Sequence, residues 1–346
     1  MDLRTYISEL VKLDWLTVVE RRVNWKFEIG EIARGSFHPL LFTNIKDYPG
    51  QSVFTGGLGR DELVSLSMGV NTGAKSAEIA KVIRQRTAQP LEPVVVKESL
   101  VLKNVQRKNS IDINRFAVPW WSNIDGGRFI GTWHLNITKN IQTGKRNVGV
   151  YRMQVMDKRR ATVSVSPRSH LAHHMALAEK ESKPLEMAVA IGVDELAVMA
   201  AGGAFDSGVD EYCMAGALMQ RPLELINCLS VDLEVPASSE IILEGVLLPH
   251  VRISDGPYLD YAGVPSSNPQ AFLFEITSVM YRDDPIFRGT SVGMPGGEDH
   301  HMLSLLAKAG LVDFHGSRIR HVIQNVLLKN RMYKAFQMSG RIKNKS

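Results

Sequence analysis

The sequence predicts a mixed α+β protein, on the basis of two changes in pattern along its 346 residues. Segments with helical and with extended periodicity alternate over the N-terminal third. A stretch rich in Trp and Pro follows at 116–124, and from 131 to 244 strand-like segments dominate around two helical ones. We therefore expect a domain boundary near residue 110. The expected units are an N-terminal domain (1–110), a second domain (111–300) and a C-terminal remainder (301–346).

The N-terminal elements follow from the spacing of their apolar residues. Leu3, Ile7, Leu10 and Val11 form a helical stripe, which predicts a helix over 3–13. The remaining expectations are strands or extended segments at 15–23, 40–45, 52–54 and 93–102, and helices at 60–68 and 76–85.

Beyond residue 110 the same patterns predict fewer helices and more strands. Expected helices cover 169–181, 209–219 and 300–309, and expected strands include 147–156 and 271–281. A segment at 315–336 is predicted to form an amphipathic helix, with Ile319, Val322, Ile323, Val326 and Leu327 on its apolar side, before a basic tail at 341–345.

Composition excludes several classes of protein. With 44% hydrophobic and 22% charged residues, the chain is globular, and 41 basic against 36 acidic residues is too small an excess to indicate nucleic-acid binding. Cys213 and Cys228 fit neither a CxxC pair nor a zinc ribbon, which favours a reducing, cytoplasmic setting. The first residues lack the apolar core of a signal peptide, and no run of 18 apolar residues occurs, so we expect a soluble protein without a membrane partner.

Two polar residues lie in the predicted strand NVGVYRMQVM, at 147–156. Side chains alternate faces along a strand, and Asn147 and Arg152 differ in parity. Both reach one site only if Asn147 lies at the start of the strand or a β-bulge intervenes. From this segment alone, Arg152 could equally form a surface ion pair.

A second group of polar residues has the types that bind a metal. His170, His173 and His174 lie at helical spacing in SPRSHLAHH, a pattern of either a metal site or an amphipathic face. Glu211 falls at the start of a helix, where the helix dipole favours a carboxylate without any function. Asn147, His170 and Glu211 together form a mixed oxygen and nitrogen ligand set, which suits Mn²⁺ or Mg²⁺ better than structural zinc. Such a metal would most naturally bridge to a phosphate.

Two carboxylates flank a Gly-Pro dipeptide in SDGPYLDYAG, where a turn is predicted. Turns attract Asp for local hydrogen bonds, which would explain Asp255 and Asp260 without chemistry. Near one arginine, however, two carboxylates would separate their pKa values, one staying ionised and the other able to act as an acid. A proton-transfer step requires that arrangement.

The order and spacing of five motifs resemble the UbiD-type decarboxylases. The motifs are NVGVYR, SHLAHH, EYCMAGAL followed by RPLELINC, VDLEVPASSEIILEG, and DGPYLDYAG. The similarity extends from MDLRTYISEL to PGGEDHHM. Members of this family use prenylated FMN and act reversibly on aromatic and α,β-unsaturated carboxylic acids. The resemblance implies an N-terminal α/β domain, a central split β-barrel of the flavin-reductase kind that carries the cofactor, and a C-terminal α/β domain that usually builds the dimer.

The resemblance also implies a cofactor site. Asn147, His170 and Glu211 look like the ligands of the divalent metal, typically Mn²⁺, that holds the cofactor phosphate beside a potassium ion. The full set of expected cofactor-binding residues is Asn147, Val150, Arg152, Ser169, His170 and Glu211.

Arg152, Asp255 and Asp260 look like the catalytic residues of the family. Asp260 is the candidate proton donor, while Arg152 and Asp255 would tune its pKa and orient the substrate carboxylate. The position of Asp255 is commonly Glu in the family, and that of Asp260 is Glu or Asp. Both side chains are therefore short here, and a proton donor must come within hydrogen-bonding reach of its target.

The expected function is the reversible non-oxidative decarboxylation of an aromatic or α,β-unsaturated carboxylic acid, with a flavin prenyltransferase as supplier of the cofactor. Family members continue beyond the point where this sequence ends, so we expect a truncated C-terminal domain and either a homo-oligomer or completion by another subunit. A noncatalytic or incomplete cofactor-binding subunit of a larger decarboxylase assembly is the alternative. A simple flavin-binding or flavin-reducing split-barrel protein would leave the spaced Asn, His and Glu unexplained.

Overall fold

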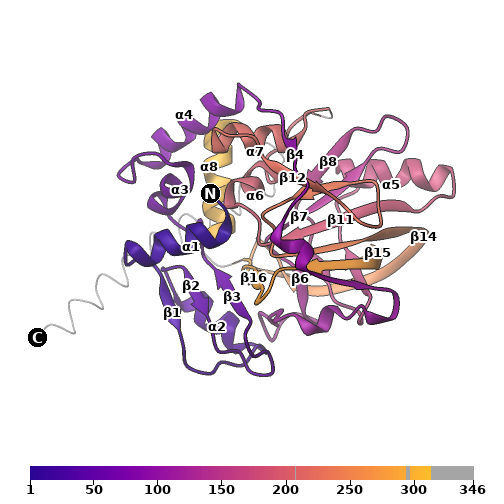
Figure 1. The fold of residues 1–346 in the computed structure, drawn as a ribbon, viewed down its shortest axis with the longest axis horizontal. Coiled ribbons are helices and arrows are strands. Elements are labelled where there is room, and N and C mark those ends of the chain that lie inside the picture. Colours follow the sequence, from indigo (N-terminus) through magenta and orange to yellow (C-terminus); the bar gives the residue numbers. More distant parts are fainter. Residues whose placement is uncertain (207, 294–296, 313–346) are drawn as a thin grey trace, which may run out of the picture.

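A computed structural model describes residues 1–206, 208–293 and 297–312 of the chain. These residues form a mixed α+β fold, in which a curled antiparallel sheet lies beside a group of helices and a smaller N-terminal sheet (Figure 1). The helices are α1 (Leu3–Lys12), α2 (Glu28–Gly35), α3 (Asp61–Met68), α4 (Ser76–Thr87), α5 (His170–Lys180), α6 (Glu195–Ala201), α7 (Glu211–Met219) and α8 (Glu298–Ala309).

The N-terminal sheet combines strands from both ends of the described chain. Its order is β1-β2-β3-β16, with β1 parallel to β2, β2 antiparallel to β3 and β3 parallel to β16. These strands are β1 (Thr17–Val19), β2 (Leu40–Phe42), β3 (Ser52–Thr55) and β16 (Ile286–Arg288). Helix α1, capped by the Asp2 carboxylate at the amide of Thr5, buries Leu3, Tyr6 and Leu10 against this layer.

The larger sheet carries the strands of the central region. Its order is β10-β15-β14-β11-β7-β8, and β5 pairs with the outer side of β15. The strands are β5 (Asn104–Arg107), β7 (His134–Lys139), β8 (Arg146–Gly149), β10 (Arg160–Val163), β11 (Leu185–Ile191), β14 (Ile241–Leu259) and β15 (Pro265–Tyr281). Smaller pairings join β4 (Val94–Val95), β12 (Glu224–Asn227) and β13 (Glu234–Pro236), and β6 (Phe129–Gly131) with β9 (Met153–Gln154).

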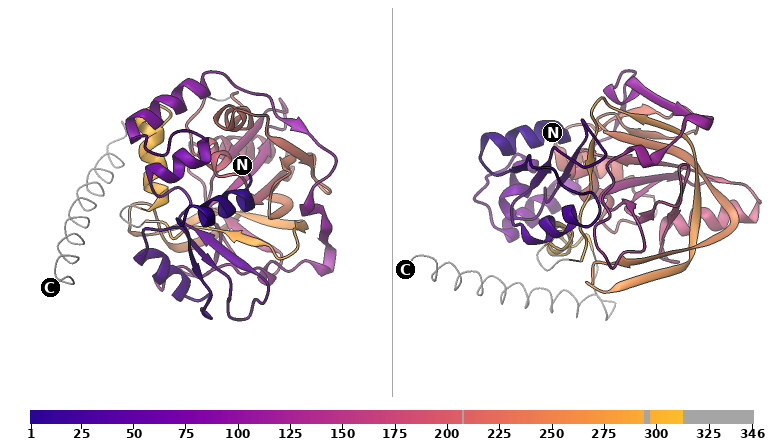
Figure 2. Two further views of the ribbon diagram at one scale, coloured as in Figure 1. Left: turned by 60° about the vertical axis from the view of Figure 1, so that its left-hand side comes forward. Right: turned by 90° about the horizontal axis from the view of Figure 1, so that it is seen from below.

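The two faces of the larger sheet bury different helices. Strand β11 shows the alternation, because Ala188 and Ala190 pack with α3, α4, α6, α7 and α8, whereas Met187, Val189 and Ile191 share a core with α5. Figures 1 and 2 place α5 at the far end of the sheet from α1, α3 and α4. Every residue of α6 is buried, as expected of a helix enclosed between a sheet and other helices.

Side-chain caps set the start of two helices that carry predicted site residues. The Ser169 hydroxyl accepts the amide N–H of Ala172 at 3.2 Å, so α5 begins at His170. The Asp210 carboxylate accepts the amide N–H of Tyr212 at 2.9 Å, so α7 begins at Glu211.

The expected strand at 93–102 is wrong over most of its length. Only Val94–Val95 is extended and paired, with β12, and a 3₁₀ helix forms at Leu100–Lys103. The Ser99 hydroxyl caps that helix by accepting the amide N–H of Val101 at 3.2 Å. This local side-chain hydrogen bond stabilises the 3₁₀ helix more than the apolar residues around it favour a strand.

The expected strand at 147–156 is divided. Strand β8 ends at Gly149, and the chain pairs again only at Met153–Gln154, where β9 meets β6. Between them, the amide of Tyr151 donates to Oδ1 of Asn136 at 2.9 Å instead of to a neighbouring strand. Asn147 and Arg152 therefore do not lie on one continuous strand, so the alternation of faces along a strand no longer relates the directions of their side chains.

The Gly-Pro dipeptide is not the turn that the sequence indicated. Gly256 and Pro257 lie inside β14, where the pairing with β15 shifts its register. The turn follows at Asp260, whose carbonyl accepts the amide N–H of Gly263 at 2.8 Å. Asp255 is therefore a strand residue, and Asp260 begins the hairpin loop.

The predicted amphipathic helix at 315–336 and the basic tail lie outside the described residues. Within the part of the chain that is described, no helix is both long enough and apolar enough to cross a membrane.

Candidate active site

A cavity of about 600 Å³ lies where the larger sheet meets α6, α8 and the loop between β14 and β15. Apolar and aromatic side chains make up much of its wall, with a small number of polar groups, as is typical of a small-molecule site. The lining residues that the argument uses are Val150, Tyr151, Arg152, Tyr258, Asp260, Tyr261, Ser266 and Asp299. Three of the residues predicted from the sequence, Val150, Arg152 and Asp260, are among them.

Arg152 is fixed in the cavity wall by a buried carboxylate. Its Nε and Nη2 lie 2.7 and 2.5 Å from Oδ1 of Asp255, and its Nη1 donates to the hydroxyl of Ser266 at 2.6 Å. The other oxygen of Asp255 accepts the hydroxyl of Thr162 at 2.7 Å, and no part of the Asp255 side chain is exposed. The prediction that Arg152 and Asp255 lie together is confirmed by this contact. Because a guanidinium carries five N–H groups, Arg152 keeps one on Nη1 for a cavity ligand, as far as the described residues go.

Asp260 lies on the same cavity, at the start of the β14–β15 loop. Its Oδ1 accepts the amide N–H of Ala262 at 2.9 Å, which is the local turn contact that the sequence left open for it. The carboxyl group is therefore oriented by the loop while it lines the cavity. Oriented carboxyl groups at a cavity wall are suited to proton transfer.

Tyr151 connects the cavity to the predicted metal ligands. Its ring folds back over Gly149, where an added Cβ would lie only 2.5 Å from a ring carbon, so this packing requires glycine. The hydroxyl lies close to the side chains of Asn147 and Ser169, and the charge of Glu211 acts on it. Burial raises the pKa of Tyr151 above its usual value.

Asn147 and Glu211 are buried polar residues whose side-chain groups are not fully compensated by the described residues around them. The amide nitrogen of Asn147 is buried and has no hydrogen-bond partner among the described residues, so it can donate to an acceptor such as a phosphate oxygen while the amide oxygen binds a cation. Burial raises the pKa of Glu211 to about 7, although its Oε2 accepts the amide N–H of Val148 at 2.9 Å. A divalent cation would offset the cost of a buried carboxylate and give the amide oxygen a ligand role, so these residues fit Mn²⁺ or Mg²⁺.

The third predicted ligand, His170, adjoins Ser169 at the first position of α5. The described residues contain no group of three or more His, Cys, Asp and Glu side chains that could hold a metal ion. The predicted set has only two residues of those types, with Asn147 as the third. His174 is accounted for structurally, because its Nδ1 lies 2.9 Å from the hydroxyl of Thr138 and burial lowers its pKa to about 4.

Sequence reasoning missed a buried charge cluster next to the cavity. Arg288 lies between Glu195 and Glu298, with nitrogen–oxygen distances of 2.7 and 2.5 Å. Glu195 also accepts the indole N–H of Trp133, and Glu298 accepts the amide N–H groups of Gly56 and Leu58. The three residues are far apart in sequence, so no local motif could reveal the cluster.

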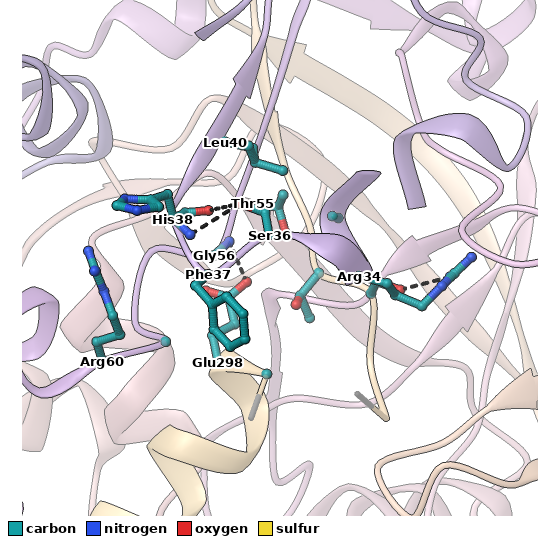
Figure 3. A pocket seen from close by; sticks show the side chains of 14 residues that line it. Arg34, Ser36, Phe37, His38, Leu40, Thr55, Gly56, Arg60 and Glu298 are labelled. Carbon is teal, nitrogen blue, oxygen red and sulfur yellow. Dashed lines mark hydrogen bonds between the residues drawn. The ribbon is translucent and has the colours of Figure 1, made fainter. Parts of the chain in front are cut away.

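A second, tighter cavity of about 180 Å³ lies between α2, β2, the end of β3 and the start of α8. Figure 3 shows Arg60 and His38 on one side of it and Arg34 on the other. Glu298 in its wall is held by Arg288, and Arg34 donates to the carbonyl of Trp121 at 2.8 Å. None of the residues predicted for catalysis or cofactor binding lines this cavity, so the larger one is the candidate active site.

Comparison with known proteins decides the family. Residues 94–295 match the 3-octaprenyl-4-hydroxybenzoate carboxy-lyase Rift-related domain of the UbiD family, and residues 7–83 match the 3-octaprenyl-4-hydroxybenzoate carboxy-lyase N-terminal domain. The chain belongs to the UbiD family. The resemblance stated from the five motifs is thereby confirmed.

Two solved structures, one of them a UbiD-class enzyme, share this fold. An evolved dimeric form of HmfF from Pelotomaculum thermopropionicum, in complex with prFMN, is 30% identical with a TM-score of 0.81, over 89% of this chain and 70% of that one. The closed form of vanillic acid decarboxylase from Sedimentibacter hydroxybenzoicus is 28% identical with a TM-score of 0.84, over 88% of this chain and 67% of that one. The mixed α+β fold is confirmed by these similarities.

Curated relatives include both named and uncharacterised proteins. An uncharacterised protein of Aquifex aeolicus is 33% identical over 87% of this chain and 66% of its own length. The pyrrole-2-carboxylic acid decarboxylase of Pseudomonas aeruginosa is 29% identical over 90% of this chain and 66% of its own length. The chain thus spans slightly less than two thirds of the length of the curated relatives it matches.

Proposed function

We propose that the chain catalyses the reversible, non-oxidative decarboxylation of an aromatic or α,β-unsaturated carboxylic acid with prenylated FMN. The observation that carries the proposal is the placement of Arg152 and Asp260 on one cavity, with Arg152 held by the buried Asp255. The family supports the reaction class, and the HmfF complex supports a prenylated flavin as the cofactor. The central region would form a split β-barrel around that cofactor, which a flavin prenyltransferase would supply.

The residues that would hold the cofactor lie around Tyr151. Asn147, His170 and Glu211 would bind Mn²⁺ or Mg²⁺ at the cofactor phosphate, with K⁺ nearby, and Ser169 would contact the same group. Val150 would line the flavin side of the cavity. When bound, the prenylated flavin supplies the ring system that takes up the electron pair of the breaking carbon–carbon bond.

Arg152 would bind the substrate carboxylate through its remaining N–H group. Since Asp255 fixes the guanidinium through Nε and Nη2, the free edge of Nη1 points in one preferred direction, which orients the acid before reaction. The apolar wall of the cavity would exclude water from the carbon that loses CO₂.

Asp260 would deliver the proton that replaces CO₂. Its loop contact with Ala262 occupies Oδ1, and the carboxyl group lines the cavity without a paired cation among the described residues. In the reverse direction, the same carboxylate would remove the proton from the carbon that is carboxylated.

The test is turnover by the chain produced together with a flavin prenyltransferase. A panel of aromatic and unsaturated acids is assayed for CO₂ release and for exchange of the product proton with deuterated water. We expect Asp260→Asn to lower both rates by about 10²-fold or more, while the exposed Asp232→Asn control leaves them unchanged. Cofactor-loaded protein that neither releases CO₂ nor exchanges any product proton would contradict the proposal.

One observation favours a noncatalytic, cofactor-binding subunit as the second candidate. Both acids have structural partners, because Asp255 is saturated by Arg152 and Thr162 and Asp260 orders the hairpin loop. In that case a homo-oligomer or another subunit would complete the catalytic site. A catalytic partner that restores turnover to the inactive loaded chain would support this second function.

A further inference from the structure

Tyr258 carries a hydroxyl group that neither the proposed chemistry nor the surrounding protein uses. The residue lies near the end of β14 and lines the large cavity together with Arg152 and Asp260. No described residue forms a hydrogen bond with this hydroxyl, and yet its oxygen is not among the buried side-chain atoms that lack a partner. The hydroxyl therefore keeps accessible surface, and the cavity is the open space that Tyr258 borders.

The ring of Tyr258 is held beside the guanidinium of Arg152. The centre of the ring lies 4.4 Å from that of Phe129 and 5.3 Å from Cζ of Arg152. Across the β14–β15 hairpin Tyr258 pairs with Ser266, whose hydroxyl accepts a hydrogen bond from Nη1 of Arg152. The tyrosine ring and the guanidinium are therefore neighbouring parts of one cavity wall.

The hydroxyl of Tyr258 is suited to donate a hydrogen bond to an anion. Burial, reinforced by nearby carboxyl groups, holds the pKa of Tyr258 well above its usual value, so the hydroxyl keeps its proton near neutral pH. Among the described residues, Asp255 and Ser266 take all but one N–H of the Arg152 guanidinium. A carboxylate has two oxygens that each accept hydrogen bonds, so a carboxylate at Arg152 has room for a second donor.

We propose that Tyr258 is a specificity-determining residue, whose hydroxyl donates a hydrogen bond to the substrate carboxylate beside Arg152 and so selects a carboxylate over an uncharged group of the same shape. This inference rests on the proposed function, since it places the acid at Arg152. A hydrogen bond to a charged acceptor is stronger than one to a neutral acceptor. The carboxylate loses its charge as CO₂ forms, so this bond is strongest before the transition state and acts on substrate binding rather than on kcat.

The first experiment measures binding by the chain loaded with unprenylated FMN, with the flavin absorbance as the readout. Benzoate is paired with nitrobenzene, and 2-naphthoate with 2-nitronaphthalene, because a nitro group has the shape of a carboxylate without its net charge. We expect Tyr258→Phe to raise the Kd of at least one acid by about tenfold, and the Kd of its nitro partner by less than about twofold. Tyr281→Phe is the matched control, because Tyr281 also lies beside an arginine, Arg115, but does not line the cavity.

A second variant separates the hydroxyl from the ring. Tyr258→Phe keeps the ring beside Arg152, and thermal unfolding should show no loss of stability, because the hydroxyl has no partner among the described residues. Tyr258→Leu removes the ring as well. Acid binding that is weakened in Tyr258→Leu but not in Tyr258→Phe would mean that the residue only packs against Arg152, which overturns the proposal.

Kinetics of the chain loaded with prenylated FMN give a readout of a different kind. In Tyr258→Phe we expect KM for an acid substrate to rise by about tenfold, while kcat changes by less than about threefold. A fall in kcat at constant KM would contradict a role in carboxylate binding.

The outcomes for Tyr258 and for the decarboxylase proposal are distinguishable. Turnover by the wild-type chain with unchanged Kd and KM in Tyr258→Phe, or with equal losses for an acid and its nitro partner, overturns the role of Tyr258 and leaves the decarboxylase proposal standing. A selective loss of acid binding in Tyr258→Phe, without any turnover by the wild-type chain, supports the role of Tyr258 and contradicts the decarboxylase proposal. Absence of binding by both acids overturns both.

Discussion

Two arginines of this chain pair with buried carboxylates, yet their surroundings differ. Arg288 is 1% exposed, lies between Glu195 and Glu298, and has the rings of Trp133 and Phe54 at 4.6 and 5.2 Å. Arg152 is 16% exposed, has Asp255 as its ion-pair partner among the described residues, and has the ring of Tyr258 at 5.3 Å.

The difference separates a structural cluster from a site available to a ligand. All three nitrogens of the Arg288 guanidinium are bonded within the protein. Its charge and hydrogen bonds lower the pKa of Glu298 even though burial opposes this, whereas burial raises the pKa of Glu195. The three nitrogens of Arg152 also have partners, which are one carboxylate and the hydroxyl and carbonyl of Ser266, but this side chain is 16% exposed and lines the cavity. Similar residues therefore stabilise the fold in one place and are proposed to bind the substrate in the other.

The largest expected effect on activity comes from Arg152→Lys. A lysine keeps a cation against Asp255 but loses the planar fork, so it cannot hold Asp255 and a substrate carboxylate in one geometry. We expect kcat/KM to fall by about 10²- to 10³-fold, with a loss of about 2 kcal/mol in the free energy of unfolding, because the hydrogen bond to Ser266 is lost while a cation stays against the buried Asp255. Steady-state kinetics and urea unfolding measure the two. Arg159→Lys, at a loose surface pair with Glu275, is the control, and an active Arg152→Lys enzyme would remove Arg152 from the mechanism.

The opposite result is expected for Arg288→Met. This change leaves two buried carboxylates without their cation, which costs about 3–5 kcal/mol of stability. Urea unfolding measures the loss, and Arg160→Met, at an exposed pair with Asp157, should change stability by less than about 1 kcal/mol. The folded fraction of Arg288→Met should bind cofactor normally. A stable but inactive Arg288→Met protein would contradict the purely structural role of Arg288 and its contrast with Arg152.

A smaller effect is expected for Tyr151→Phe, on the cofactor side of the Arg152 cavity. Removal of the hydroxyl takes away a polar group beside Asn147 and Ser169, which would help to orient the proposed metal and phosphate ligands. Loss of such an orienting partner commonly weakens metal binding by about tenfold. Fluorescence titration of FMN and metal analysis by mass spectrometry measure the change, with Tyr281→Phe as the control. Unchanged Kd values in Tyr151→Phe would reduce Tyr151 to a packing residue.

The smallest effect is expected for Asp125→Asn. Burial raises the pKa of Asp125 to about 6 from 3.8, and neither Arg34 nor Arg152 pairs with it among the described residues. Between about pH 4 and pH 6 the folded chain therefore binds more protons than the unfolded chain, so stability falls as pH rises through this window. Asparagine keeps an acceptor for the amide of Leu259 and removes the buried charge. We expect Asp125→Asn to be more stable at pH 7.5 by about 1 kcal/mol, with a flatter dependence between pH 4 and pH 6.

Thermal or urea unfolding at several pH values measures this change. A loss of stability in Asp125→Asn at pH 7.5 would mean that an ionised Asp125 contributes an attraction to Arg34 or Arg152 after all.

The elements that the sequence predicted correctly have local signals. Helices α1, α3, α4 and α5 have periodic apolar faces or capping residues, and β2, β3 and the end of β15 have runs of apolar and β-branched residues. Helix α6 was missed because it is buried on all sides and so has no periodic contrast. The prediction of a strand at 93–102 was wrong because the Ser99 hydroxyl caps a 3₁₀ helix, and the apolar pattern of this segment gives no sign of that cap.

The residues of the candidate site also fall into those that the sequence predicted and those that it missed. Arg152 and Asp255 were found because they occupy positions that resemble a family motif, although 103 residues separate them in sequence. Tyr151 and Asp299 stood inside quoted motifs, NVGVYR and PGGEDHHM, without a role. Their surroundings depend on a ring folded over Gly149 and on an Asp299 oxygen that is buried without a hydrogen-bond partner among the described residues, and neither feature follows from residue type or spacing.

The most direct test of the account is the cofactor and metal content of the chain after production with a flavin prenyltransferase. Absorbance and intact mass identify the flavin, and elemental analysis identifies the metal. We predict bound prenylated FMN with Mn²⁺, and loss of both in His170→Ala and Glu211→Ala but not in His173→Ala. Well-folded protein that contains neither flavin nor metal would contradict the assignment of Asn147, His170 and Glu211 and the decarboxylase function proposed for this chain.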